Sequence, residues 1–119
     1  MTDEAPSHAP IPPVAQPREV AARMHGGEPL RLLDVREPGE NEFVALPGST
    51  LIPLGELASR VHEIDAWAGQ EFIVYCHHGV RSGHAVAWLR SQGFHGARNL
   101  SGGIDRWSLE IDASVRRYG

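Results

Sequence analysis

"EFIVYCHHGVRSGHAVAWLRSQG", residues 71–93, holds a strand, a short loop and a helix in direct succession. Its first six residues are the most apolar strand candidate of the chain and are mainly aromatic or β-branched, which is typical of a buried strand. Residues with helical spacing, and a glycine that can cap a helix, follow the loop: Ala85, Trp88, Leu89 and Gly93. The sequence therefore predicts a strand at residues 71–76 that leads, through a tight loop, into a helix starting near Ser82.

The same alternation of strands and helices continues on both sides of this stretch. Short apolar runs predict further strands at residues 30–35, 50–54 and 97–100. Helical signals predict helices that begin at Pro17, Leu57 and Gly102. Residues 36–49, "REPGENEFVALPGS", predict a turn-rich connection. Strands that alternate with helices imply βαβ units, and hence an α/β fold: a parallel sheet with helices on both faces.

Length and composition limit the organisation of the chain. With 119 residues it can form one ordinary domain and has no room for a second catalytic one. The opening residues are rich in proline and alanine without a hydrophobic period, so we expect residues 1–15 to be a flexible tail and residues 16–119 to form the domain. The net charge is −4, and 15 acidic and 11 basic residues leave no basic stripe for a phosphate backbone. No apolar run could cross a bilayer and no targeting segment is visible. We therefore expect a cytoplasmic protein that binds neither nucleic acid nor membranes.

Cys76 is the only cysteine, so it cannot form a disulfide within the chain, which suits a reducing compartment. Ligands of open parallel sheets bind outside the carboxyl ends of the strands, where the predicted central strand places Cys76. Gly79 lets the loop curl, so that successive backbone N–H groups turn toward the sulfur or an anion beside it. The helix start near Ser82 and the guanidinium of Arg81 would both favour the nucleophilic thiolate. The same donors would stabilise a persulfide anion.

The spacing between Cys76 and Arg81 narrows the chemistry. Four residues separate them: His77, His78, Gly79 and Val80. Cysteine phosphatases place five residues in this interval, which makes the loop wide enough for a tetrahedral phosphate that the arginine clamps. A loop one residue tighter fits a single sulfur better than a phosphoryl group. The spacing therefore favours sulfur transfer over dephosphorylation.

Other interpretations of these residues stay open at this point. Cys76 alone could be a small buried apolar residue. Together with His77 and His78 it could suggest a metal site, but adjacent side chains on a tight loop diverge and no fourth ligand stands out, so we expect no metal. Arg81 could face the pocket or brace the loop through a carboxylate such as Glu37. We expect the substrate site to be lined by His77, His78, Gly79, Val80 and Ser82.

Three segments in order carry a resemblance to a known family: "LLDVREPGENEFVALPGSTLIPLGEL" (32–57), "IVYCHHGVRSGHAVAWLRSQGF" (73–94) and "NLSGGIDRWS" (99–108). From about residue 14 to its end, the chain resembles the single-domain rhodanese (thiosulfate sulfurtransferase) family. The resemblance implies a five-stranded parallel sheet flanked by helices, and a persulfide carried on Cys76 at the start of a six-residue active-site loop. It also implies that Asp34 and Arg36 mainly organise the fold near the site.

One stretch departs from the family pattern. Many members carry Gly-His-Ile-Pro-Gly after the signature that contains Asp34 and Arg36, whereas this chain has "VALPG". Val44 and Ala45 thus stand in place of a glycine and a histidine. We expect this difference to alter local structure or docking and to leave the loop around Cys76 intact.

The leading hypothesis for function is sulfur transfer in two steps. The Cys76 thiolate takes sulfur from a small-molecule donor such as thiosulfate and passes it to cyanide, a thiol or a sulfur-carrier protein. No metal or organic cofactor is needed. Two alternatives are a non-catalytic regulatory or docking module, which a retained cysteine and complete loop argue against, and a cysteine phosphatase-like enzyme, which the short spacing argues against.

Overall fold

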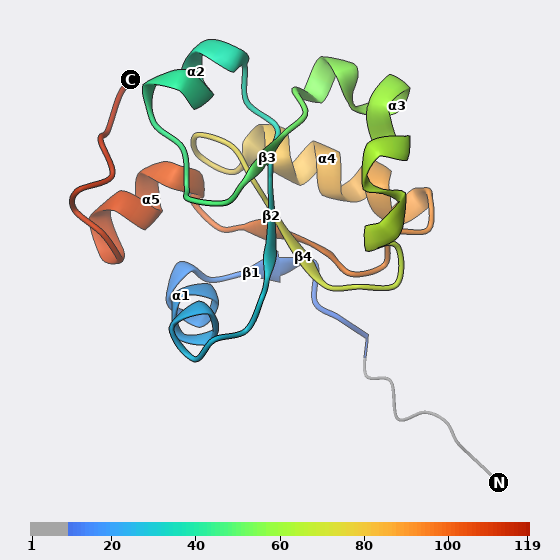
Figure 1. Ribbon diagram of the computed structural model, residues 1–119, viewed down its shortest axis with the longest axis horizontal. Coiled ribbons are helices and arrows are strands. Elements are labelled where there is room, and N and C mark those ends of the chain that lie inside the picture. Colours follow the sequence, from blue (N-terminus) through green and yellow to red (C-terminus); the bar gives the residue numbers. More distant parts are fainter. Residues whose placement is uncertain (1–9) are drawn as a thin grey trace, which may run out of the picture.

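The computed structural model describes residues 10–119, which form one five-stranded sheet with every strand pair parallel (Figure 1). The strand order across the sheet is β1-β5-β4-β2-β3, so β4 is central and is flanked by β5 and β2. The strands are Val14–Ala15 (β1), Arg31–Asp34 (β2), Thr50–Leu51 (β3), Phe72–Tyr75 (β4) and Ala97–Leu100 (β5). The parallel sheet predicted from the alternating pattern is confirmed, as is the number of strands implied by the family resemblance.

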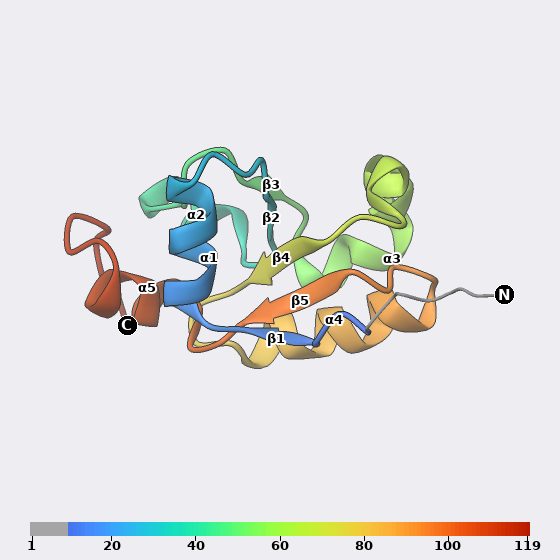
Figure 2. The ribbon, with the colours of Figure 1, turned by 90° about the horizontal axis from the view of Figure 1, so that it is seen from below.

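Helices cover both faces of this sheet, as predicted (Figure 2). They are Pro17–His25 (α1), Pro38–Phe43 (α2), Leu57–Arg60 (α3), Val80–Ser91 (α4) and Gly103–Glu110 (α5), with 3₁₀ segments at Leu54–Glu56 (η1) and Val61–Trp67 (η2). Side chains from α1 and α5 pack on one face, and side chains from α3 and α4 pack on the other. Among residues 10–119, no helix is both long enough and apolar enough to cross a membrane.

The central strand β4 divides the core into two layers. Phe72, Val74 and Cys76 belong to the cluster that contains α3 and α4, whereas Ile73 and Tyr75 belong to the cluster that contains α1 and α5. Because successive side chains of a strand point to opposite faces, a strand that is covered on both sides is apolar throughout. The same alternation turns the Cys76 side chain toward the α4 layer.

The predicted tail, residues 1–15, is corrected at its end. Val14 and Ala15 form β1, which pairs with β5, and Ala15 is fully buried. Arg98 of β5 donates hydrogen bonds to the carbonyl oxygens of Pro12 and Val14, both at 2.8 Å. These backbone contacts order a segment that has no hydrophobic period to reveal it. Residues 1–9 of the predicted tail lie outside the described residues.

The predicted turn-rich connection also contains a helix. It is α2, which begins with Pro38 and buries no side chain. The Glu40 carboxylate accepts a hydrogen bond from the backbone N–H of Glu37 at 3.0 Å, as in a capping box. A short helix without a buried face lacks the periodic apolar signal that predicts helices, so the sequence pattern missed it.

The helix predicted from Leu57 onward is interrupted. Only Leu57–Arg60 is α-helical, and the chain then continues as the 3₁₀ segment η2, where Ile64 has a non-helical backbone. Leu57 and Ile64 are nevertheless both buried against the sheet. The apolar stripe therefore predicted which side chains enter the core, although it did not predict the backbone between them.

Candidate active site

Cys76 directly follows β4, at the carboxyl edge of the central strand. Its side chain is 1% exposed and its thiol is free. The next helix, α4, begins at Val80, two residues before the predicted start at Ser82. Gly79 joins loop and helix with φ of +102°, which is in the left-handed region that favours glycine. The loop between strand and helix is therefore even tighter than predicted, and Arg81 lies in the first turn of α4.

Three donor groups surround the Cys76 sulfur. The backbone N–H of Gly79 lies 3.1 Å from Sγ, the backbone N–H of Ser82 lies 3.3 Å from it, and the Ser82 hydroxyl oxygen lies 3.2 Å from it. The two N–H groups come from the loop and the first turn of α4, where backbone donors have no partner within the helix. The sulfur thus occupies a position in which negative charge is stabilised by fixed dipoles.

Asn99 of β5 binds two of the residues around the sulfur, Gly79 and Ser82. Its side-chain N–H donates to the Gly79 carbonyl oxygen at 3.0 Å, and its amide oxygen lies 2.6 Å from the Ser82 hydroxyl. The hydroxyl has one proton and two neighbouring acceptors, Asn99 and the sulfur, so that proton is shared between them. Asn99 was not among the site residues predicted from the sequence. A polar residue near the carboxyl end of a strand next to β4 was the signal that could have found it.

The start of α5 supports the Cys76 loop on the side away from the sulfur. The backbone N–H groups of Ile104 and Asp105 donate to the carbonyl oxygens of Cys76 and His77, at 2.9 and 3.1 Å. Gly103 makes this approach possible, because a Cβ at its position would collide with those same two carbonyl groups. With the carbonyl oxygens bound on the α5 side, the loop keeps its N–H groups on the sulfur side.

Arg81 is paired with Glu40 of α2. Two guanidinium nitrogens lie 2.7 and 2.8 Å from the two carboxylate oxygens, and the Arg81 side chain remains 35% exposed. Arg81 lowers the pKa of Glu40 to about 2, and Glu40 in turn raises the pKa of Arg81, with a smaller contribution from Cys76. Of the two orientations that the sequence left open, the structure shows the bracing one. The carboxylate is Glu40 and not Glu37, the example that sequence analysis named.

Asp34 and Arg36 form a fully buried ion pair at the carboxyl end of β2. Arg36 donates from Nε and Nη2 to the two Asp34 oxygens, at 2.9 and 2.7 Å. Burial alone would lower the pKa of Arg36, but its hydrogen bonds to Asp34 and Tyr118 raise it. Arg36 also donates to the Val44 carbonyl oxygen at 2.7 Å. The stretch in which Val44 and Ala45 depart from the family pattern is therefore held through its backbone, which any residue can supply.

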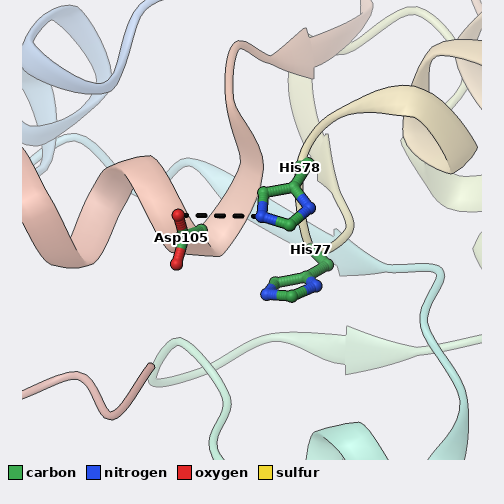
Figure 3. Close-up of side chains that lie close together, drawn as sticks. All are labelled: His77, His78 and Asp105. Atoms are coloured by element: carbon green, nitrogen blue, oxygen red, sulfur yellow. Dashed lines mark ion pairs between the residues drawn. The ribbon is translucent and has the colours of Figure 1, made fainter. Parts of the chain in front are cut away.

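His77 and His78 of the loop lie close to Asp105 of α5 (Figure 3). The nitrogen and oxygen atoms that could bind a metal lie within 4.8 Å of one another. However, the His77 and His78 rings lie nearly face to face, 3.8 Å apart and tilted by 31°, so their lone pairs run side by side and do not converge on one point. Asp105 is moreover bound by Arg117 at 2.8 Å. The arrangement does not match the ligand geometry of a metal ion.

The other predicted site residues differ in their exposure. Val80 is 69% exposed at the start of α4, and His78 is exposed with its Nε2 3.7 Å from Asp105. His77 is half-buried, and burial together with the neighbouring His78 lowers its pKa. Its ring stacks on Tyr118 at 3.9 Å. Tyr118 was absent from the predicted site, because it lies 41 positions after His77 and the sequence gives no local sign of this contact.

The chain matches known proteins over most of its length. The model of the rhodanese-like domain family matches residues 16–110. The probable adenylyltransferase/sulfurtransferase MoeZ of Mycobacterium tuberculosis is 33% identical over 102 residues, which cover 86% of this chain and 26% of MoeZ. The putative sulfur carrier protein YrkF of Bacillus subtilis is 36% identical over 86 residues, which cover 72% of this chain and 45% of YrkF. The chain thus spans less than half the length of these relatives.

Solved structures of similar size show the same fold. The human single-domain sulfurtransferase TSTD1 superposes with a TM-score of 0.72 at 28% sequence identity, covering 84% of this chain and 97% of TSTD1. The family match spans most of the sheet and the whole Cys76 loop, and the superposition extends over nearly all of TSTD1. The chain belongs to the rhodanese-like domain family.

Proposed function

We propose that this protein is a sulfurtransferase that carries sulfane sulfur as a persulfide on Cys76. The observation that carries the proposal is the set of two backbone N–H groups and one hydroxyl around a free thiol at the carboxyl edge of the sheet. The sulfurtransferase activity named for MoeZ and for TSTD1 supports the same reaction class.

The reaction that fits this site has two half-reactions. In the first, the Cys76 thiolate attacks the outer sulfur of thiosulfate, the sulfur–sulfur bond of the donor breaks, and sulfite leaves with the bonding electron pair. The enzyme then holds the persulfide anion Cys76–S–S⁻. In the second, cyanide or a thiolate attacks the outer sulfur, the persulfide bond breaks, and the Cys76 thiolate is restored. The two steps need no metal or organic cofactor.

The protein contributes mainly by stabilising charge on sulfur. Hydrogen bonds to charged groups are worth about 1.5–3 kcal/mol each, so the N–H groups of Gly79 and Ser82 favour both the thiolate and the persulfide anion. His77, His78 and Val80 border the loop and are proposed to contact the donor or acceptor. A free thiolate has to be kept reduced between cycles, so we place the reaction in a reducing compartment such as the cytoplasm.

The acceptor is proposed to be a sulfur-carrier protein or a small thiol, and the donor a small anion such as thiosulfate. YrkF is named as a putative sulfur carrier, which supports a protein partner of this kind. A purely regulatory docking module would not need three donors on a buried sulfur. A phosphatase would need both terminal nitrogens of Arg81 to clamp phosphate, whereas both are already bound to Glu40.

The decisive experiment is the intact mass of the protein after incubation with thiosulfate. We expect the wild type to gain the mass of one sulfur atom, and to lose it when cyanide is added and thiocyanate forms. The Cys76→Ser variant should gain nothing under the same conditions. An unmodified wild type, or hydrolysis of an aryl phosphate at a comparable rate, would reject the proposal in favour of the docking module or the phosphatase.

A further inference from the structure

The last residues of the chain lie against the active-site loop. We name Arg116–Gly119 the C-terminal strap. Arg116 places its guanidinium 3.9 Å from the ring centre of Phe43 in α2, and Arg117 forms an ion pair of 2.8 Å with Asp105 in α5. Figure 1 shows this segment, in red, beside α2. The strap is thus attached to two elements that each contact the Cys76 loop or Arg81.

Tyr118 is the residue of the strap with the most contacts to the site. Its ring stacks on His77 with centroids 3.9 Å apart and an angle of 10° between the planes. Its hydroxyl donates to Glu40 at 2.7 Å and accepts from Arg36 at 3.0 Å. Burial raises the pKa of Tyr118 to about 12, so the hydroxyl keeps its proton near neutral pH. Because Glu40 also holds Arg81, Tyr118 connects the buried Arg36 to the arginine of the loop.

One polar atom beside the strap lacks a hydrogen-bond partner among the described residues. The Nε2 atom of His77 is buried and has no hydrogen-bond partner among residues 10–119. Leaving a buried polar atom unpaired is costly, and the atom would regain water if the strap moved away. The strap is attached through a few side chains, and its position over the loop carries the cost of this unpaired atom. A segment that a partner can displace requires such a balance.

We propose that Tyr118 is a positioning and specificity-determining residue, which holds the strap over the Cys76 loop so that small molecules reach the sulfur more readily than bulky ones. The consequence for sulfur transfer rests on the proposed function. Small donors and acceptors reach the sulfur while the strap stays in place. A protein acceptor has to displace Tyr118 before its thiol reaches the persulfide.

The test compares alkylation of Cys76 by a small reagent, iodoacetamide, and a bulky one, fluorescein maleimide. In the Tyr118→Ala variant we expect the ratio of bulky to small rate constants to rise at least about tenfold, because the variant loses the stack on His77 and two hydrogen bonds to charged groups. Tyr118→Phe keeps the ring over His77 and loses only the hydroxyl contacts, so its ratio should lie between those of the wild type and Tyr118→Ala.

Two further measurements separate this role from a general loosening of the protein. The His77 ring protons of the wild type should resonate upfield because they lie under the Tyr118 ring, and this shift should become smaller in Tyr118→Ala, where only the His78 ring still shields them. Leu109→Ala, an exposed apolar position on α5 without a contact to the site, is the matched control and should leave the ratio unchanged. If Tyr118→Ala is unstable, Arg117→Ala releases the other attachment of the strap and should change the ratio in the same direction.

Several results would overturn the inference. These are equal acceleration of both reagents in Tyr118→Ala, a ratio in Tyr118→Phe as high as in Tyr118→Ala, or ordinary His77 shifts in the wild type. Alkylation needs only the thiol and no sulfur donor, so its outcome is independent of persulfide formation. A strap-dependent ratio in a protein that never gains sulfur would reject the proposed function alone, and persulfide formation with an unchanged ratio would reject the strap alone.

Discussion

Two carboxylates at opposite edges of the sheet have the same exposure and similarly lowered pKa values, but the arginines that bind them differ in their other contacts. Glu71 precedes β4 at the amino edge, and Glu40 lies in α2 at the carboxyl edge. Each side chain is 21% exposed, and pairing with arginine lowers the pKa of each to about 2. The difference between them lies in what else their arginines contact.

At the amino edge, every guanidinium nitrogen of Arg23 and Arg98 donates to a protein acceptor, although the Arg23 side chain is 30% exposed. Arg23 and Arg98 both donate to Glu71, and Arg98 also binds Glu19 of α1 at 2.6 Å. Arg98 is only 5% exposed, and its remaining N–H groups reach the backbone that leads into β1. This network joins β1, α1, β4 and β5, so its effect is on stability.

At the carboxyl edge, the arginine has one side free. Arg81 pairs with Glu40, is 35% exposed and lies within electrostatic range of the Cys76 sulfur. The same kind of ion pair therefore holds a group that an incoming anion could still reach. An arginine–carboxylate pair therefore does not by itself distinguish a structural role from a functional one. The other groups near the arginine have to be considered: backbone carbonyl oxygens for Arg98, and the Cys76 sulfur for Arg81.

The largest expected effect is on activity alone. Cys76→Ser should abolish sulfur transfer, since a hydroxyl cannot carry sulfane sulfur. Its free energy of unfolding should stay within about 1 kcal/mol of the wild type, because the donors around the sulfur can bind an oxygen. Thiocyanate formation and urea unfolding measure the two properties. Transfer at the original rate would mean that Cys76 is not the nucleophile.

The next effect is on stability alone. Arg98→Ala should lower the free energy of unfolding by about 3 kcal/mol, because it leaves carboxylates and backbone carbonyl oxygens without their buried donor. The control is Arg31→Ala, which removes an exposed arginine from the start of β2 and should cost much less. Sulfur transfer per folded molecule should be the same in both variants. A loss of activity in folded Arg98→Ala would contradict the statement that the amino edge affects stability alone.

A pair of amide substitutions sharpens the comparison. Glu40→Gln should release Arg81 toward anionic donors, and the KM for thiosulfate should fall roughly three- to tenfold, the value of a weakened charge-assisted contact. Glu71→Gln removes the same charge at the other edge and should leave KM unchanged while lowering the melting temperature. Steady-state kinetics and thermal unfolding of both variants give the four values needed. Equal KM values for the two variants would show that Arg81 does not meet the donor.

The smallest effect is the response to acid. The pKa of Glu40 and of Glu71 is about 2 in the folded protein, below the ordinary value of 4.5. Each therefore contributes its full stabilisation above pH 4.5 and loses it as the pH falls toward 2. In each amide variant, the free energy of unfolding should fall by on the order of 1 kcal/mol less than in the wild type over this pH range. The difference is small because solvent screens both pairs. A decline as steep as that of the wild type in either variant would mean that its carboxylate pair adds no stability.

Much of the fold and the centre of the site could be predicted from sequence. The apolar run before Cys76 predicted a buried central strand, and the alternation of strands and helices predicted a parallel sheet. The motifs around Asp34, Cys76 and Gly102 were sufficient to indicate the family. These features depend on residues close together in the chain, where periodicity and turn residues act directly.

The parts that sequence patterns missed depend on partners far along the chain. Strand β1 is ordered by β5, and α2 has no buried face of its own. Asn99 binds the loop at Gly79, which lies 20 residues earlier in the chain. The apolar runs predicted only four strands, and the fifth was implied by the family resemblance.

By itself, the sequence determined that a lone cysteine ends a buried strand and that a glycine, an arginine and a helix follow at fixed spacing. Only the tertiary structure decided where the Arg81 side chain goes, because Glu40 is 41 residues away, and it alone brought Tyr118 to Glu40 across 78 residues. The physical reason is that local sequence controls backbone geometry, whereas the charge balance and the cover of a site depend on which distant side chains the folded core brings beside it.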